Sequence, residues 1–178
     1  MSLSLSGNGT IGGFDAGLSG FGGLVQVVFG SDDTRLQATP GNNDPYDVGF
    51  DVTITPTDAA NLLIVYGVAN VGGNNRSPSG STYVHLFRDG TETNLKGTAV
   101  GSRKPGAGMG VASYDPVSQV PIVWSEVAGS TSATTFSIYV SHGQTSTTVV
   151  NWNRPDSDGD DLQTLLPKST LLIAEVTP

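Results

Sequence analysis

The sequence predicts an all-β fold, a β-sandwich or barrel that follows a glycine-rich arm. Short apolar stretches rich in β-branched and aromatic residues alternate with Gly, Pro, Asn and Asp, which is typical of strands joined by turns. No segment shows a sustained 3.6-residue period, so no helix is expected. Eight to ten short strands with turn signals between them favour a sandwich or a barrel.

The first element is an arm over residues 1–23, which holds eight of the 24 glycines and a single charge, Asp15. Glycine loses the most backbone entropy on ordering and packs no side chain, so such an arm cannot fold alone. We expect it to anchor a second unit, residues 24–178, to a larger assembly. The candidate anchoring residues are the apolar ones: Leu3, Leu5, Ile11, Phe14, Leu18 and Phe21.

The β domain follows from Leu24 onward as a series of short strands. Residues 57–61 (TDAAN) are the best helical candidate but are too short, and they are expected to form a loop. Long loops are expected at 30–47, 70–80, 97–119 and 153–168. The expected strands are 24–29, 48–55, 61–69, 81–88, 92–97, 120–127, 133–141, 146–152 and 169–176, with a weaker one near 109–114.

Apolar alternation separates two kinds of strand. In 48–54 the even positions are apolar and the odd ones are not, which predicts one buried and one wet face. Strands 62–69, 82–87 and 171–176 are apolar on both faces, so something must cover their outer side. The cover is either a neighbouring subunit or a large internal loop. The candidate oligomer-interface residues are Leu63, Val65, Tyr83, His85, Phe87 and Leu172.

Composition narrows the function classes. The net charge is −8, which disfavours nucleic acid and anionic membrane surfaces as partners. Only 13% of the residues are charged, so Ser, Thr, Asn and Gly must form much of the surface, as in many structural and extracellular β proteins. The absence of cysteine excludes disulfides, thiol catalysis and thiolate metal sites. No stretch is long enough to span a membrane, and the N-terminus lacks a signal-peptide pattern.

Catalytic patterns are not found, so we predict a non-enzymatic protein. His85 and His142 are isolated and lack metal-ligand spacing. His85 lies in mid-strand, where packing in the core or an interface is expected. If three copies met at a three-fold axis there, His85 would make assembly acid-sensitive.

Two loop features could bind ligands. Asp156, Asp158 and Asp160 in RPDSDGDDL could hold Ca²⁺, although a helix–loop–helix calcium pattern would need Gly in place of Asp161 and Glu in place of Pro167. The alternative is a solvated turn. Loop aromatics can stack on sugar rings, or can fill the core instead. The candidate receptor-binding residues are Tyr46, Arg76, Tyr114 and Trp152.

Several short motifs carry a resemblance to a known family. The chain is similar to the terminal β domain of tail-fibre and other virion appendage proteins of tailed, cyanophage-like bacteriophages. The glycine-rich opening LSLSGNGTIGGFDAG is also similar to the starts of such proteins. The motifs are Thr53–Pro56, Leu62–Ala69, Leu86–Gly90, Thr131–Phe136 and Leu172–Val176.

The resemblance implies a jelly-roll-like antiparallel β-sandwich that forms a homotrimer and has no catalytic role. It implies a virion location, with synthesis in the host cytoplasm and release by lysis. Its expected partners are other virion proteins of the baseplate or capsid and a host cell-surface glycan. Full tail fibres carry a long shaft before this domain, whereas only about 23 residues precede it here.

Three functions are therefore carried forward. The first is a short trimeric tail fibre that is docked by its arm and presents loops for host attachment. The second is a trimeric capsid decoration or cement protein of the phage head. The third is a carbohydrate-binding module or a glycan-processing enzyme, for which Glu126 and the Asp156–Asp161 cluster are the available acids.

Overall fold

Strands form all the regular secondary structure that the chain shows in its described parts. The computed structural model describes residues 22–40, 44–73, 82–93, 95, 98, 108–110, 117–142, 149–155 and 166–178. The turn at 57–61 is a loop as expected, in which the Asn61 backbone N–H donates to the Asp58 carbonyl at 3.2 Å.

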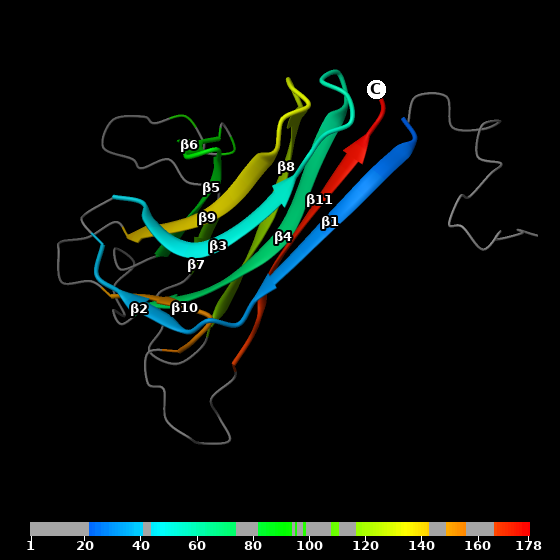
Figure 1. Cartoon of the computed structure of the whole chain (residues 1–178). Coiled ribbons are helices and arrows are strands. Elements are labelled where there is room, and N and C mark those ends of the chain that lie inside the picture. Colours follow the sequence, from blue (N-terminus) through cyan, green and yellow to red (C-terminus); the bar gives the residue numbers. More distant parts are fainter. Residues whose placement is uncertain are drawn as a thin grey trace, which may run out of the picture.

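Two antiparallel sheets lie face to face (Figure 1). Sheet A contains β1 (Leu24–Asp32), β11 (Ser169–Val176), β4 (Leu62–Gly73), β8 (Ser118–Val127), β10 (Val150–Trp152) and β2 (Leu36–Ala38). Sheet B contains β3 (Tyr46–Ile54), β9 (Thr134–His142), β5 (Thr82–Arg88), β6 (Thr91–Glu92) and β7 (Gly108–Gly110).

The strand order is that of a jelly roll. Eight strands remain when β2, β6 and β10 are left aside and the equally short β7 is kept as the edge partner of β5. Sheet A then runs β1-β11-β4-β8. Sheet B runs β3-β9-β5-β7. The first strand thus pairs with the last and the second with the last but one, as when a long hairpin is rolled into two Greek keys. The predicted all-β, jelly-roll-like sandwich is confirmed.

The core lies between the sheets and is built by inward alternation. In β3 the even positions from Val48 to Ile54 face inward and the odd ones are exposed, as the sequence predicts. Trp152 in β10 is 1% exposed and packs against Phe50, with ring centroids 6.2 Å apart. Apolar side chains from both sheets interdigitate around this pair.

Some strand limits differ from those expected. Strand β6 spans Thr91–Glu92 where a strand was predicted at 92–97, and β7 spans Gly108–Gly110 where one was predicted near 109–114. Residues 94, 96–97 and 111–114 lie outside the described part of the chain. Strand β2 lies inside a segment that was expected to be a loop. It forms because β10 pairs with it from more than 100 residues away, and the three residues LQA carry no periodic signal of their own.

The end of the sandwich that carries the C-terminus also carries the beginning of β1 (Figure 1). The Gly23 N–H donates to the Thr177 hydroxyl at 2.7 Å, and the Thr177 N–H donates to the Gly23 carbonyl at 3.0 Å. A Cβ on Gly22 would lie 1.3 Å from the Thr177 carbonyl oxygen, so glycine is required for this close approach.

Candidate functional site: the outward faces of the two sheets

The outward side of sheet A is an apolar surface that crosses four strands. One row runs from Phe29 on β1 through Leu172 on β11 and Tyr66 on β4 to Val123 on β8, each paired in register with the next. We call this surface the apolar face. Its outward residues are Val25, Val27, Phe29, Leu62, Ile64, Tyr66, Val68, Val123, Val127, Leu172, Ala174 and Val176.

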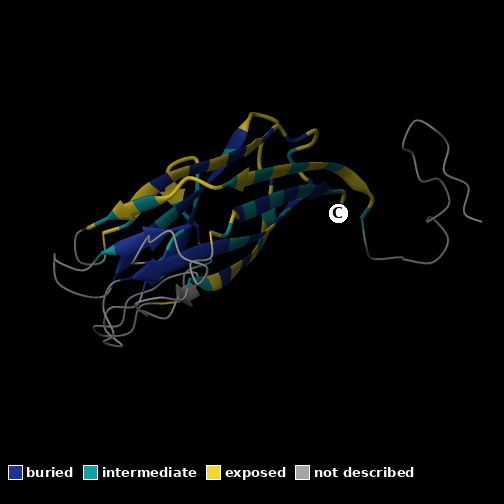
Figure 2. Cartoon of the chain, turned by 90° about the horizontal axis from the view of Figure 1, so that it is seen from below, coloured by how far each residue is buried: buried dark blue, intermediate teal, exposed yellow. Residues whose placement is uncertain are grey.

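Large side chains on the apolar face are open to solvent. Phe29 is 63% exposed, Tyr66 55%, Val123 59% and Val127 56%. From Val25 onward β1 alternates between exposed and intermediate positions, and β11 alternates between buried and intermediate ones, which gives the stripes in Figure 2. Single exposed apolar residues are ordinary, but a continuous patch of this kind marks an interaction surface.

No charged side chain points outward among the register-paired residues of β1, β11, β4 and β8. The acids of these strands turn inward, where each has a partner. Asp32 accepts from the Trp152 indole at 2.6 Å, and Glu126 lies 3.1 Å from Arg88. Glu175 is completely buried. The apolar face is therefore uncharged although the chain carries a net charge of −8.

A shallow hollow of about 320 Å³ lies on the apolar face between β4 and β8. Its lining residues are Leu62, Ile64, Val123, Trp124 and Ser125. Phe29 lies on the opposite edge strand of the same face. The face thus carries a projecting ring on one side and a depression on the other.

The outward side of sheet B carries polar and titratable groups instead. His85 Nδ1 is 2.7 Å from Glu92 Oε1, and His85 Nε2 is 2.7 Å from Ser141 Oγ. This is the order of groups in a Ser-His-acid triad. However, Ser141 is 0% exposed, so a substrate has no access to its hydroxyl. The arrangement fits a buried polar network in which each group satisfies the next.

Neighbouring side chains cover a further part of this side over β5 and β9, while the outward positions of β3 from Asp47 to Thr53 are exposed. The rings of Phe87 and Tyr139 stack with centroids 4.0 Å apart. Burial raises the pKa of the Tyr139 hydroxyl, and the charges of Asp47 and Asp51 raise it further. Sheet B therefore covers much of its own outward side within one chain.

A buried carboxylate fastens the turn between β3 and β4. Glu175 Oε1 accepts from the Thr57 N–H at 2.8 Å, the Thr57 hydroxyl at 2.9 Å and the Asn61 amide at 2.7 Å. Glu175 Oε2 accepts from the Gln26 amide at 2.6 Å. Burial alone would raise the pKa of Glu175, but the hydrogen bonds from Asn61, Gln26 and Thr57 lower it to about 2.

Residues of the other motifs make contacts at the same end of the sandwich as the turn between β3 and β4. Arg88 on β5 donates to the Val127 carbonyl of sheet A at 3.2 Å, which links the two sheets. Asp89 Oδ1 accepts from the Thr135 N–H at 2.8 Å, and the Thr135 hydroxyl lies 2.8 Å from that of Thr53. The motifs at 53–56, 86–90, 131–136 and 172–176 thus each contain a residue that makes a structural contact at this end.

Four predicted site residues are wrong. Leu63 and Val65 are 0% exposed and lie in the core, so they cannot contact a second subunit. His85 is 3% exposed and bonded on both ring nitrogens within its own chain, so three copies cannot converge on it. Trp152 is a core residue and cannot contact a receptor.

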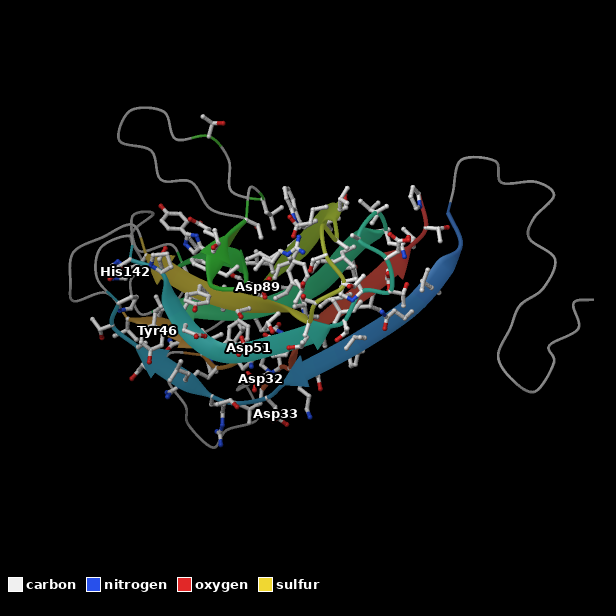
Figure 3. All side chains as sticks on the ribbon, turned by 45° about the horizontal axis from the view of Figure 1, so that its top comes forward. Asp32, Asp33, Tyr46, Asp51, Asp89 and His142 are labelled. Atoms are coloured by element: carbon white, nitrogen blue, oxygen red, sulfur yellow. The ribbon has the colours of Figure 1, made fainter. Side chains whose placement is uncertain are left out.

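Other predicted residues lie outward. Leu172 is part of the apolar face, and Tyr83 and Phe87 are half-buried on the outward side of sheet B. Tyr46 is 40% exposed and lies at the same end of the molecule as His142 (Figure 3).

The remaining predicted residues lie outside the described part of the chain. They are Leu3, Leu5, Ile11, Phe14, Leu18, Phe21, Arg76, Tyr114, Asp156, Asp158 and Asp160. The calcium site therefore stays a prediction. Within the described ranges, no group of three or more His, Asp or Glu residues could hold a metal ion. The described residues also contain no helix long and apolar enough to cross a membrane.

The sequence analysis did not identify the exposed residues at the centre of the apolar face, which are Phe29, Tyr66 and Val123. The apolar character of both faces of 62–69 was the correct signal, but the outward positions are the even ones. Strand β8 carried a second signal, because its outward residues Val123 and Val127 alternate with inward Ile122 and Trp124.

No protein-family model and no curated protein matches this sequence. Among solved structures, the chain is similar to infectious bursal disease virus VP2 in the crystal structure of the VP2 subviral particle. The TM-score is 0.35 at 14% identity, over 86% of this chain and 37% of that one. The chain therefore spans little more than a third of the structure it matches.

Proposed function

We propose that this chain is a non-catalytic structural protein of a virus particle, a trimeric appendage of a tailed phage that its N-terminal arm docks to the particle. The observation that carries the proposal is the uncharged apolar face, which is suited to permanent protein contacts. The jelly-roll order, the low charge content and the similarity of the short motifs to phage appendage domains also support it.

The non-catalytic part of the proposal is supported by the burial of the triad-like group formed by Ser141, His85 and Glu92. A serine nucleophile must reach a substrate carbonyl, and Ser141 has no exposed surface. Ser141 contacts His85, and His85 contacts Glu92. These contacts form a network that links β5, β6 and β9.

The test is immunogold electron microscopy of particles purified from the lysate in which the chain is made. Label at the tail tip is expected, and it would assign host attachment to the exposed loops. Label spread over the head would replace the tail-fibre role with that of a decoration protein. Label absent from particles, with the chain found only in the soluble lysate, would overturn a virion role.

A further inference from the structure

The apolar face carries complementary features at its two edges. Phe29 projects from β1, and the hollow lies between β4 and β8 at the other side of the same sheet. Leu172 and Tyr66 fill the row between them. A surface that holds both a projection and a depression of matching apolar character can bind a second copy of itself.

The charge of the chain makes the apolar face the place where two copies can meet with the least repulsion. Two copies that each carry a net charge of −8 repel one another at most orientations. The apolar face has no outward charge in its paired strands, so contact there adds no direct pair of like charges. Its outward polar groups, such as Ser31 and Ser125, are small and neutral.

The size of the face is comparable to that of a standard protein interface. Its two half-exposed aromatic rings and its exposed valines present apolar area on the order of 600 Å², at the upper end of the largest patch on a typical monomer. A standard interface buries about 800 Å² per partner, so these residues alone supply about three quarters of that area.

We propose that copies of this chain assemble through the apolar face, with Phe29 of one copy seated in the hollow beside Val123 of the next. This inference rests on the structural role proposed above, because a structural protein of a particle keeps permanent contacts between its copies. A two-fold axis parallel to the strands places β1 of each copy over β8 of the other and makes the contact twice. A closed ring of three makes the same contact head to tail.

Disulfide trapping tests the contact directly, because the chain contains no cysteine of its own. The full-length double variant Phe29→Cys/Val123→Cys is oxidised and run on a denaturing gel. Within one chain these positions are three strand spacings apart, about 14 Å. That exceeds the roughly 7 Å Cα separation that a disulfide spans, so any bond joins two copies.

The expected product is a covalent species that ends at three copies, as the trimer proposed above requires. A species that ends at two copies would support the contact through the apolar face but contradict the trimer. The single variants Phe29→Cys and Val123→Cys are the controls and should give little product. A double variant that stays at 18.3 kDa, or that crosslinks no more than the single variants, would overturn the proposal.

A second measurement covers the wild-type chain. Light scattering should give a mass that is a multiple of 18.3 kDa, and Phe29→Glu should return it to one copy. Tyr46→Glu is the matched control, since it makes the same kind of change at an exposed position on sheet B. A wild-type monomer, or an unchanged mass for Phe29→Glu, would assign the face to a different partner. Either result is independent of where the label falls on particles.

Discussion

The outward sides of the two sheets differ in how far one chain covers their aromatic side chains. Both are built by the two-residue alternation of a strand, and both carry aromatic residues. On sheet B, His85 is bonded to Glu92 and Ser141, and Phe87 is stacked on Tyr139, so the aromatic and titratable groups over β5 and β9 are covered within one chain. On sheet A, Phe29 and Tyr66 remain more than half exposed. The difference indicates which side of the molecule needs a partner.

The largest expected effect is the difference in stability between variants on the inward and outward faces of β4. Leu63→Ala should lower the free energy of unfolding by roughly 2–5 kcal/mol, because it leaves a cavity at a site that is 0% exposed. Tyr66→Ala, three residues along β4, should cost the protomer less than about 1 kcal/mol, as surface changes do. Urea unfolding in the Phe29→Glu background, where copies are separated, measures both.

The mass of the assembly should rank the two variants in the opposite order to their stability. Tyr66→Ala should weaken self-association, whereas Leu63→Ala should leave the mass of the folded protein unchanged. If Leu63→Ala dissociated the assembly while Tyr66→Ala did not, the assignment of the two faces would be reversed.

The second expected effect is a loss of stability at acidic pH. The pKa of Glu175 in the folded state is about 2, below the 4.5 of an unperturbed carboxyl. The unfolded chain therefore takes up the proton first, and stability is lost as the pH falls from about 4.5 towards 2. The loss is on the order of 2–3 kcal/mol. The apolar face has no acid or base that titrates in this range, so its contacts should persist until the fold is lost.

Two variants isolate this contribution in urea titrations between pH 7 and pH 2.5. Glu175→Gln should lower the stability at pH 7 and flatten its pH dependence, since the amide cannot accept from all the donors that surround it. Asp33→Asn is the control. The pKa of Asp33 is also lowered, by Lys168, but the side chain is 69% exposed. An equal flattening by Asp33→Asn would contradict the assignment to Glu175.

The sequence was sufficient for the fold class but not for the identity of the outward residues. Alternation in β3 showed its inward side because the other side is polar. In β4 both sides are apolar, and only the register with β11, about 100 residues away, shows that Tyr66 lies beside Leu172. Glu175 adds to the ambiguity, because a charged residue normally indicates an outward position and this one is buried among donors.

The smallest expected effect concerns the outward side of sheet B. Ser141→Ala removes the group that bonds His85 Nε2 and leaves a buried ring nitrogen without that partner. The cost should be about 1 kcal/mol or slightly more in urea unfolding. The mass of the assembly should not change, because the network lies on the opposite sheet from the apolar face.

Ser132→Ala, at an exposed loop position, is the matched control and should be neutral within about 0.5 kcal/mol. The same variant pair separates a packing role from a catalytic one. Catalytic groups are often held at a cost in stability, so replacing a serine nucleophile is expected to be neutral or stabilising. A loss of stability on Ser141→Ala therefore supports the buried network. A gain, together with labelling of the wild-type chain by a serine-directed phosphonate, would show instead that sheet B carries a catalytic site.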